Sequence, residues 1–303
     1  MKNKIVIIGC GRVGMSYVYA LLNQKTKVTE IVLIDIDEER VKGEAMDLNH
    51  GLPFAPTKIN IKAGTYLDCM DASIVCICAG ATQKKGEERL KLTERNNEIV
   101  KEIIDNVLRT NFHGIFLIAI NPVDIMTYIV QKYSRFPVGK VIGTGTTLDT
   151  ARLRFMIGDY LTVNPKNVHA YVLGEHGDSE FVSWSNAFVG SGPIKEYLSE
   201  KKQQELEQEV KNMAYEIIQR KEATYYGIGM SLVRITNAIL NNENTVLTVS
   251  SYSPKHNLYV GMPSVVNQRG VVSINKMILN DEEKEKFKKS INIIKEEIER
   301  IGV

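Results

Sequence analysis

A series of short apolar runs, rich in β-branched residues, constrains the fold more than any other feature of the chain. Five of these runs lie in the first half, at Lys4–Gly9, Glu30–Asp35, Ser73–Ala79, Gly114–Ile120 and Lys140–Gly143. Runs of this length without a polar face are typical of strands that are covered on both sides, as in a parallel sheet. Segments with helical patterning lie between them, at 13–22, 38–49 and 93–110. The alternation predicts an α/β fold with a doubly wound parallel sheet.

The pattern changes at about residue 147, where strict alternation ends. We expect a helix from Asp149, and apolar residues recur at helical spacing over 203–221 and 287–301. Two apolar runs, Val246–Tyr252 and Leu258–Met262, are joined by a Ser-Pro-Lys-His-Asn turn and predict a hairpin. These features predict two domains, a first over residues 1–146 and a second, mixed α+β domain over residues 147–303.

Composition excludes several classes of protein. The 303 residues include 38 basic and 36 acidic side chains, a net charge of +2 that argues against nucleic-acid or membrane-surface binding. No apolar run approaches the roughly 20 residues that span a bilayer, and the first residues lack the pattern of a secretory signal. The four cysteines have no zinc-site spacing, so we expect no metal and no disulfide. A cytoplasmic protein is expected.

A glycine-rich turn follows the first apolar run. Gly9-Cys-Gly-Arg-Val-Gly14 has the spacing G-x-G-x-x-G, which alone is also found in turns that bind nothing. Here a strand leads into Gly9 and a helix leaves at Gly14, so free backbone N–H groups and the helix dipole can hold a pyrophosphate. Asp35 lies 21 residues after Gly14, where a carboxylate binds a ribose 2′-hydroxyl and repels a 2′-phosphate. A Rossmann domain that binds NAD is predicted, although Arg40 leaves NADP open.

A histidine between glycines is the strongest catalytic candidate. His176 lies in Gly174-Glu-His-Gly-Asp178, where its glycine neighbours offer little to pack against, so a purely structural role is disfavoured. An imidazole is well suited to proton transfer near neutral pH.

Five motifs in order resemble the L-lactate/malate dehydrogenase family. They are the glycine turn, Ala79-Gly-Ala-Thr-Gln-Lys-Lys-Gly-Glu-Glu-Arg89, Asn121-Pro-Val-Asp124, Gly143-Thr-Gly-Thr-Thr-Leu-Asp-Thr-Ala-Arg152 and Gly174-Glu-His-Gly-Asp-Ser179. The resemblance runs along essentially the whole chain and is closest to the lactate branch, in particular its bacterial members. It implies an NAD-dependent dehydrogenase of small 2-hydroxy acids. A protein that kept the fold without the chemistry would have no need to retain all of these motifs.

The resemblance implies four catalytic residues. His176 would be the proton donor and acceptor, and Asp149 would hold its tautomer and stabilise the imidazolium. Arg152, three residues after Asp149 on a helix, would bind the substrate carboxylate bidentately. Arg89 would be brought to the substrate carbonyl by a lid over 81–91 that closes on the site. Without the resemblance, this charged stretch would be interpreted as a solvated loop. A surface ion pair is the alternative for Asp149 and Arg152.

The implied contact residues form two sets. Substrate contacts fall to Gln83, Arg89, Asn121, Asp124, Asp149, Arg152 and Thr236. Cofactor contacts fall to Gly9, Gly11, Val13, Gly14, Asp35, Arg40, Tyr66, Gly80, Ala81, Ala119, Asn121 and Thr144.

Gln83 bears on the choice of substrate. Within the family this position separates lactate from malate enzymes, because a second arginine there would pair with the second carboxylate of oxaloacetate. A neutral glutamine favours pyruvate and lactate, with malate dehydrogenase as the alternative.

A second anion site is also implied. Arg154 and His169 match positions that bind fructose 1,6-bisphosphate at a subunit interface in many bacterial relatives, although a surface charge and a strand-end polar residue are the plainer readings. We expect activation by the bisphosphate and, as is usual in the family, a homotetramer.

Overall fold

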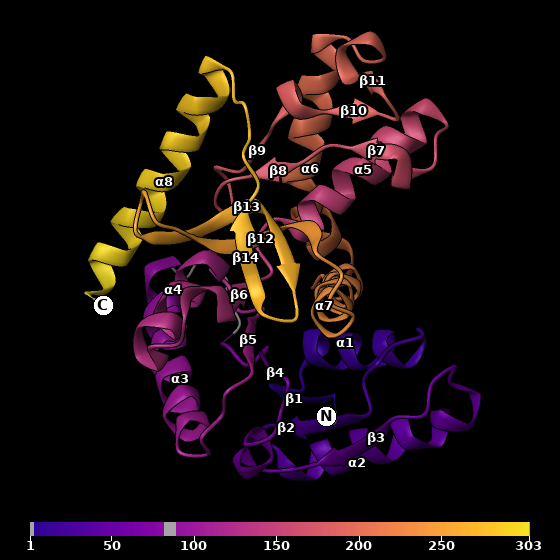
Figure 1. Cartoon of the computed structure of the whole chain (residues 1–303), viewed down its shortest axis with the longest axis vertical. Coiled ribbons are helices and arrows are strands. Elements are labelled where there is room, and N and C mark those ends of the chain that lie inside the picture. The colour runs from indigo at the N-terminus through magenta and orange to yellow at the C-terminus, as the bar shows by residue number, and fades with distance from the viewer. Residues whose placement is uncertain (1–2, 82–88, 303) are drawn as a thin grey trace.

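The computed structural model describes residues 3–81 and 89–302, and for residues 89 and 90 it describes the backbone alone. A nine-stranded sheet with the order β14-β13-β12-β6-β5-β4-β1-β2-β3 runs through the molecule (Figure 1). Its strands are β1 (Lys4–Ile8), β2 (Glu30–Ile34), β3 (Asn60–Ala63), β4 (Ile74–Ile77), β5 (Ile115–Ile118), β6 (Val141–Gly143), β12 (Thr245–Ser253), β13 (Leu258–Asn267) and β14 (Gly270–Ile274). Neighbouring strands from β3 to β6 are parallel, which confirms the predicted doubly wound sheet.

Helices pack on both faces of this sheet. One face carries α1 (Arg12–Leu22), α2 (Glu38–Gly51) and α7 (Tyr226–Leu240). The other carries α3 (Arg89–Leu108), α4 (Val123–Ser134) and α8 (Asp281–Ile301), and α8 lies along the outside of the molecule (Figure 1). The two layers explain the continuous apolar runs. In β1, Val6 and Ile8 face one core and Ile5 and Ile7 face the other, so the strand is apolar at every position after Lys4.

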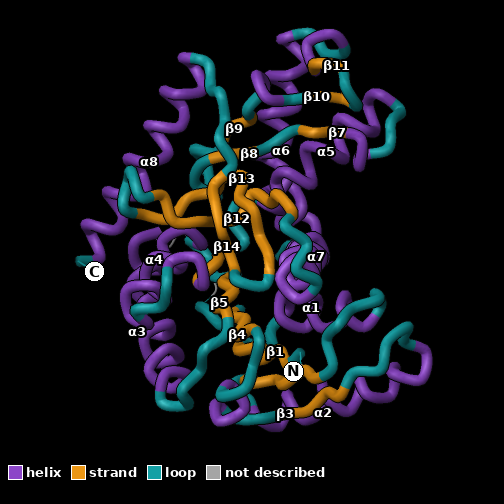
Figure 2. Tube along the Cα trace, in the orientation of Figure 1, coloured by secondary structure: helices purple, strands orange, loops and turns teal. Residues whose placement is uncertain are grey.

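The second half of the chain continues the same sheet. Strands β12 and β13 pair antiparallel from Thr245 and Val266 to Ser253 and Leu258, so the predicted hairpin is confirmed and is longer than expected. Ser250 of β12 pairs with Gly143 of β6 and joins the hairpin to the parallel strands. The colouring by secondary structure shows these strands as one band through the centre (Figure 2). The two halves of the chain therefore share a core layer.

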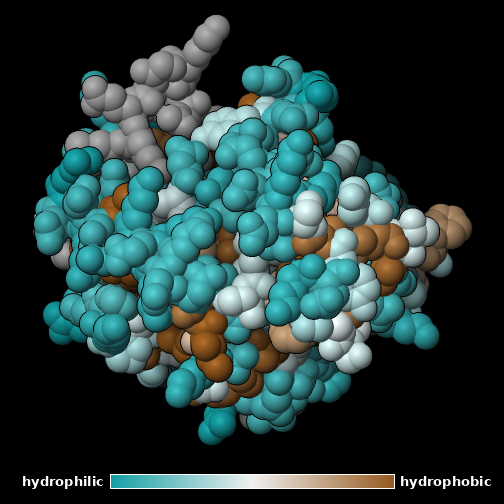
Figure 3. Space-filling model, turned by 90° about the horizontal axis from the view of Figure 1, so that it is seen from above, coloured by the Kyte–Doolittle hydropathy of each residue, from teal (hydrophilic) through white to brown (hydrophobic). Residues whose placement is uncertain are grey.

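A smaller lobe lies beyond the hairpin. It contains α5 (Thr147–Leu161), α6 (Glu200–Lys221) and the short strands β7 (Val168–His169), β8 (Val172–Leu173), β9 (Phe181–Val182), β10 (Phe188–Val189) and β11 (Gly192–Pro193). Its separate core packs Leu153 and Ile157 of α5 against Leu206 and Val210 of α6. From above, the surface is mainly hydrophilic with hydrophobic side chains in separate patches (Figure 3). Among the described residues, none of the helices has the length and apolarity to cross a bilayer.

Candidate active site

The first two turns of α5 supply a carboxylate and a guanidinium. Asp149 and Arg152 are three residues apart, so both side chains leave the same side of the helix. Arg152 Nη1 lies 2.8 Å from Asp149 Oδ1, and the two side chains are only 12% and 2% exposed. A pair this deeply buried is not the surface ion pair that the sequence left open. The guanidinium has further N–H groups with which it can bind a second anion.

His176 lies in the tight connection between β8 and β9. Gly174 before it has φ +98°, and its N–H and C=O both pair with Gly261 of β13, so the turn is anchored to the hairpin. The backbone N–H of His176 donates to Asp124 Oδ2 at 2.8 Å. The ring Nδ1 lies 2.6 Å from Asp149 Oδ2. Nε2 is therefore the nitrogen left to exchange a proton with a substrate.

The charges of this couple support each other. Burial by itself would lower the pKa of His176, but the negative charge of Asp149 and the hydrogen bond to it raise that pKa to about 9. Burial would likewise raise the pKa of Asp149, yet His176 and Arg152 hold it below its usual 3.8. The two directions agree, so the geometry favours an imidazolium next to a carboxylate at neutral pH.

A second acid reaches the same imidazole. Glu180 Oε2 lies 3.8 Å from His176 Nδ1, and the side chain is 5% exposed. Donor atoms of Asp149, His176 and Glu180 all lie within 4.8 Å of one another, a spacing that could suggest a metal site. The 2.6 Å between Nδ1 and Asp149 Oδ2 is a hydrogen-bond distance, shorter than the separation of two ligands on one ion.

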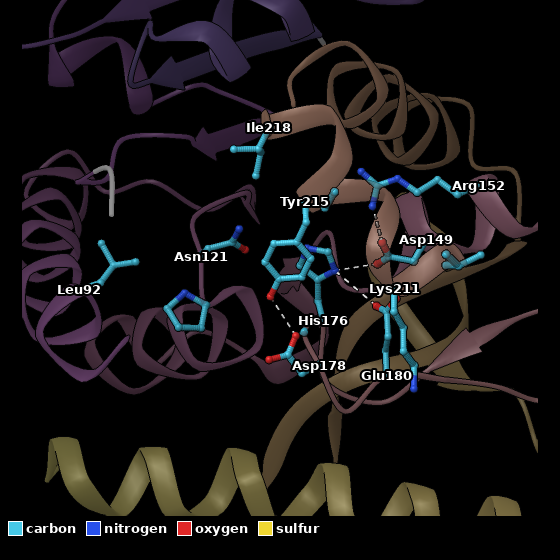
Figure 4. Close-up of a pocket in the computed structure, with 14 residues that line it drawn as sticks. Leu92, Asn121, Asp149, Arg152, His176, Asp178, Glu180, Lys211, Tyr215 and Ile218 are labelled. Atoms are coloured by element: carbon cyan, nitrogen blue, oxygen red, sulfur yellow. Dashed lines mark hydrogen bonds and ion pairs between the residues drawn. The ribbon is translucent and has the colours of Figure 1, made fainter. Parts of the chain in front are cut away.

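These groups face a cavity of about 410 Å³ (Figure 4). Its wall includes Asn121, Arg152, His176, Asp178 and Tyr215, with further residues from α3 and α6. Tyr215 of α6 donates to Asp178 Oδ1 at 3.0 Å and so joins that helix to the histidine loop. The cavity is large enough for a small anion beside an extended cofactor end.

The glycine turn and Asp35 form a second site at the carboxyl ends of β1 and β2. A side chain on Gly9, at φ +98°, would collide with the backbone of Ala79, whereas nothing lies within 4 Å of a Cβ placed on Gly11. Gly11 caps α1 without a side-chain acceptor, and the first turn of α1 contains no acid. The N-terminus is therefore open to an anion. Asp35 accepts from Cys10 N at 2.7 Å and from Arg40 at 3.1 Å.

Comparisons with known proteins agree with this geometry. Profiles of the lactate/malate dehydrogenase NAD binding domain and α/β C-terminal domain match residues 3–143 and 146–302. The chain belongs to the lactate/malate dehydrogenase family. It is 50% identical to the L-lactate dehydrogenase of Bacillus pumilus over 97% of this chain and 96% of the relative. It is an NAD-dependent oxidoreductase.

Solved structures of lactate dehydrogenases have the same fold. One from a Medee basin deep-sea metagenome superimposes with a TM-score of 0.97, at 49% identity, over 100% of this chain and 99% of that one. The minor L-lactate dehydrogenase of Enterococcus mundtii in its ligands-bound form gives 0.96, at 45% identity, over 99% and 98%.

The residues of this dehydrogenase fit NAD. Asp35 can accept from ribose hydroxyls at the end of β2, where it would oppose a 2′-phosphate. The other predicted cofactor residues lie around the same sheet edge: Gly80, Ala81 and Ala119 follow β4 and β5, Thr144 follows β6, Val13 and Gly14 open α1, and half-buried Tyr66 follows β3. Each lies in the segment that follows the carboxyl end of a parallel strand, either in a loop or in the first turn of the next helix, as a dinucleotide requires. Their contacts with NAD stay predictions.

Four of the predicted substrate residues are not seen on the wall of the cavity. Gln83 and the side chain of Arg89 lie outside the described residues. Asp124 was expected to contact substrate, but it is 1% exposed and both oxygens accept from the protein, from His176 N and from Ser250 Oγ. Asp124 therefore supports the histidine loop from within. Thr236 is fully buried in α7 with its hydroxyl 2.5 Å from that of Tyr17, and a direct substrate contact stays a prediction.

Two features of the site had no sequence motif. Asn96 of α3 is 1% exposed, accepts from Ala81 N at 2.7 Å and donates to the carbonyl of Asn121 at 2.8 Å. It thereby ties the loop after β4 to the loop after β5. The wall contributed by α6, including Tyr215, was also missed, because its apolar spacing predicts a helix without showing which end covers the cavity.

Proposed function

We propose that this dehydrogenase is an L-lactate dehydrogenase that reversibly reduces pyruvate to L-lactate with NADH. The observation that carries the proposal is the buried imidazole of His176, bonded to Asp149 at 2.6 Å, beside Arg152 on the wall of one cavity. A proton carrier and a carboxylate-binding group at one small site match the two ends of a 2-keto acid.

The roles of the residues follow from their chemistry. Arg152 binds the substrate carboxylate, which fixes the keto carbon near His176. NADH, when bound, supplies the hydride to that carbon. His176 gives the proton from Nε2 to the keto oxygen, while Asp149 stabilises the imidazolium beforehand and keeps Nδ1 protonated afterwards. In lactate oxidation His176 takes the proton back. We assign Arg89 to polarising the carbonyl on lid closure.

The test compares pyruvate with oxaloacetate as substrates, and the oxidation of NADH is measured by the loss of its absorbance. We expect pyruvate to be preferred, and Gln83→Arg to shift the ratio of kcat/KM toward oxaloacetate by at least about tenfold, since a pocket charge then pairs with the second carboxylate. His176→Asn is the control that should abolish both activities. Preference for oxaloacetate in the unmodified protein would identify a malate dehydrogenase instead. An unchanged ratio in Gln83→Arg would refute the assignment of Gln83.

A regulatory anion site on the outer face of α5 is proposed as well. Arg154 is two residues from Arg152 and so faces away from the cavity. Its Nε donates to the carbonyl of Ala170 at 3.0 Å, and its guanidinium stacks on Tyr171 at 5.1 Å, which places it beside the exposed His169. The guanidinium of Arg154 and the imidazole N–H of His169 are donors that support binding of a bisphosphate such as fructose 1,6-bisphosphate.

The same face supports assembly of copies of the chain. Phe155, next to Arg154, is 62% exposed, and the 38% exposed Phe188 pairs with His169 across β10 and β7. Exposed aromatic rings around Arg154 and His169 suit an interface between copies of this chain. We propose a homotetramer in which the bisphosphate neutralises facing cations and favours assembly. Pyruvate kinetics and sedimentation, with and without the bisphosphate, test this. Activation should be lost in Arg154→Ala, and no response in the unmodified protein would refute it.

A further inference from the structure

The histidine–aspartate couple has a third, unassigned acid beside it. Glu180 lies just before β9, four residues after His176. Its side chain is 5% exposed, and that of Asp149 is 2% exposed. Its Oε2 is 3.8 Å from His176 Nδ1, which is beyond a hydrogen bond, whereas Asp149 holds that nitrogen at 2.6 Å. Figure 4 shows Glu180 and Asp149 approaching the imidazole from the same side. Glu180 is therefore not an alternative orienting group for the ring.

Among the described residues, the cations closest to the two acids are bonded to Asp149 rather than to Glu180. Arg152 is bonded to Asp149 at 2.8 Å, and His176 is bonded to the same carboxylate. Other charged groups around the couple are mainly acidic, namely Asp124 behind the loop and Asp178 on the cavity wall, with Lys211 of α6 as the further cation. Lys211 lies 3.7 Å from Glu207, which already accepts from Lys286 at 3.2 Å. Two adjacent buried carboxylates with this few partners share a proton rather than both ionise.

We propose that Glu180 is a positioning residue that works as a neutral carboxylic acid, with its O–H donating a hydrogen bond to the Asp149 carboxylate. Burial raises the pKa of Glu180 well above its usual range, and the charge of Asp149 raises it further. The hydrogen bond from Glu180 in turn helps to keep Asp149 ionised. One acid of the pair thus carries the charge and the other carries the proton.

A neutral Glu180 sets the charge of the site. Within the described part of the site, Arg152, protonated His176 and ionised Asp149 then sum to one positive charge, which complements the single negative charge of a 2-keto monocarboxylate. An ionised Glu180 would cancel that charge and weaken binding of the anion. The consequence for catalysis rests on the proposed function, whereas the protonation state of Glu180 does not.

Infrared spectroscopy tests the protonation state without any turnover. At about pH 8, Asp124, with a pKa of about 6, is ionised, so the carbonyl stretch of a protonated carboxyl should come from Glu180. We expect this band in the unmodified protein and its loss in Glu180→Gln. Glu207→Gln is the matched control, because Glu207 is buried but bonded to Lys286 and should leave the band unchanged. A spectrum of the unmodified protein without such a band, or a band that survives in Glu180→Gln, would overturn the proposal.

Kinetics then test what the neutral acid does. Glu180→Gln keeps a neutral donor of the same size, so we expect KM for pyruvate within about twofold and the apparent pKa of His176 within about 0.3 unit of the unmodified enzyme. Glu180→Leu removes the donor, makes Asp149 a stronger partner and should raise that pKa by roughly half a unit or more. If Glu180→Gln instead lowers KM and lowers the pKa by about one unit, Glu180 is ionised and the proposal fails. Absence of pyruvate turnover in the unmodified protein would refute the proposed function alone, since the infrared result would stand.

Discussion

Substitution of Asp149 by asparagine should uncouple the charge of His176 from its position. The structure raises the pKa of His176 from 6.5 to about 9, which corresponds to about 3 kcal/mol of preference for the imidazolium. Asparagine keeps the size of the side chain and removes the charge, so the pKa should fall to about 6.5 or below. At about pH 8 the protonated fraction would then drop from roughly nine-tenths to a few per cent, whereas at about pH 6 both forms stay mostly protonated.

The assay is kcat/KM for pyruvate against pH, with NADH oxidation followed by absorbance. The deficit of Asp149→Asn should grow by about 20-fold between pH 6 and pH 8, and the part that persists at pH 6 measures loss of orientation. Asp159→Asn, an exposed position on the same helix, is the control and should follow the unmodified profile. Because Glu180 can ionise once Asp149 is neutral, the double variant Asp149→Asn/Glu180→Gln gives the full shift. A deficit that is independent of pH in both variants would refute the reasoning.

Three further predictions concern stability and cofactor choice. Burial raises the pKa of Asp124 from 3.8 to about 6, so the unmodified protein should lose up to about 3 kcal/mol of unfolding free energy as the pH rises from about 4 to about 6. Urea unfolding at several pH values measures this, and in Asp124→Asn the unfolding free energy should depend less on pH. A Cβ on Gly229 of α7 would lie 2.9 Å from the backbone of α1, so Gly229→Ala should lower the free energy of unfolding by about 1–3 kcal/mol. A Cβ on Gly43 of α2 meets nothing within 4 Å, so Gly43→Ala should raise it by about 0.5–1 kcal/mol. Asp35→Ser should free Arg40 and raise the ratio of NADPH to NADH use by about tenfold or more, and an unchanged ratio would exclude Asp35 from cofactor choice.

Sequence patterns predicted the buried strands well because each of them is apolar after at most one charged residue at its start. The strands beginning at Lys4, Glu30 and Ile74 are covered on both faces, so burial leaves a continuous apolar run. Helix α4 was not predicted, and its residues Val123–Val130 are all buried, so this stretch has no exposed face. Strand β3 was missed because this edge strand is short and only one of its residues, Ile61, is fully buried.

Site residues that lie in a sequence motif were predicted, whereas those that act only through contacts with residues distant in sequence were not. His176 was named from its local pattern and Asp149 and Arg152 from the family resemblance, and the structure brings the three together. Asn96 and Tyr215 carry no local signal, because each acts through a hydrogen bond to a residue distant in sequence. Glu180 was passed over because an acid near a histidine is common, and only its burial beside Asp149 makes it unusual.

The position of Asp124 explains how the nucleotide site and the histidine loop are held in a fixed relative position. Asp124 lies in the first turn of α4, three residues after Asn121, at the strand end that faces the nucleotide site. One of its oxygens accepts from the backbone of His176 at 2.8 Å and the other from Ser250 at 2.5 Å. Ser250 in turn pairs with Gly143 of β6, so the histidine loop, the hairpin and the parallel sheet meet at one carboxylate. Transfer of a hydride and a proton to neighbouring atoms requires both donors to be fixed relative to one another, and a buried charge with two hydrogen bonds fixes them more rigidly than a neutral contact would.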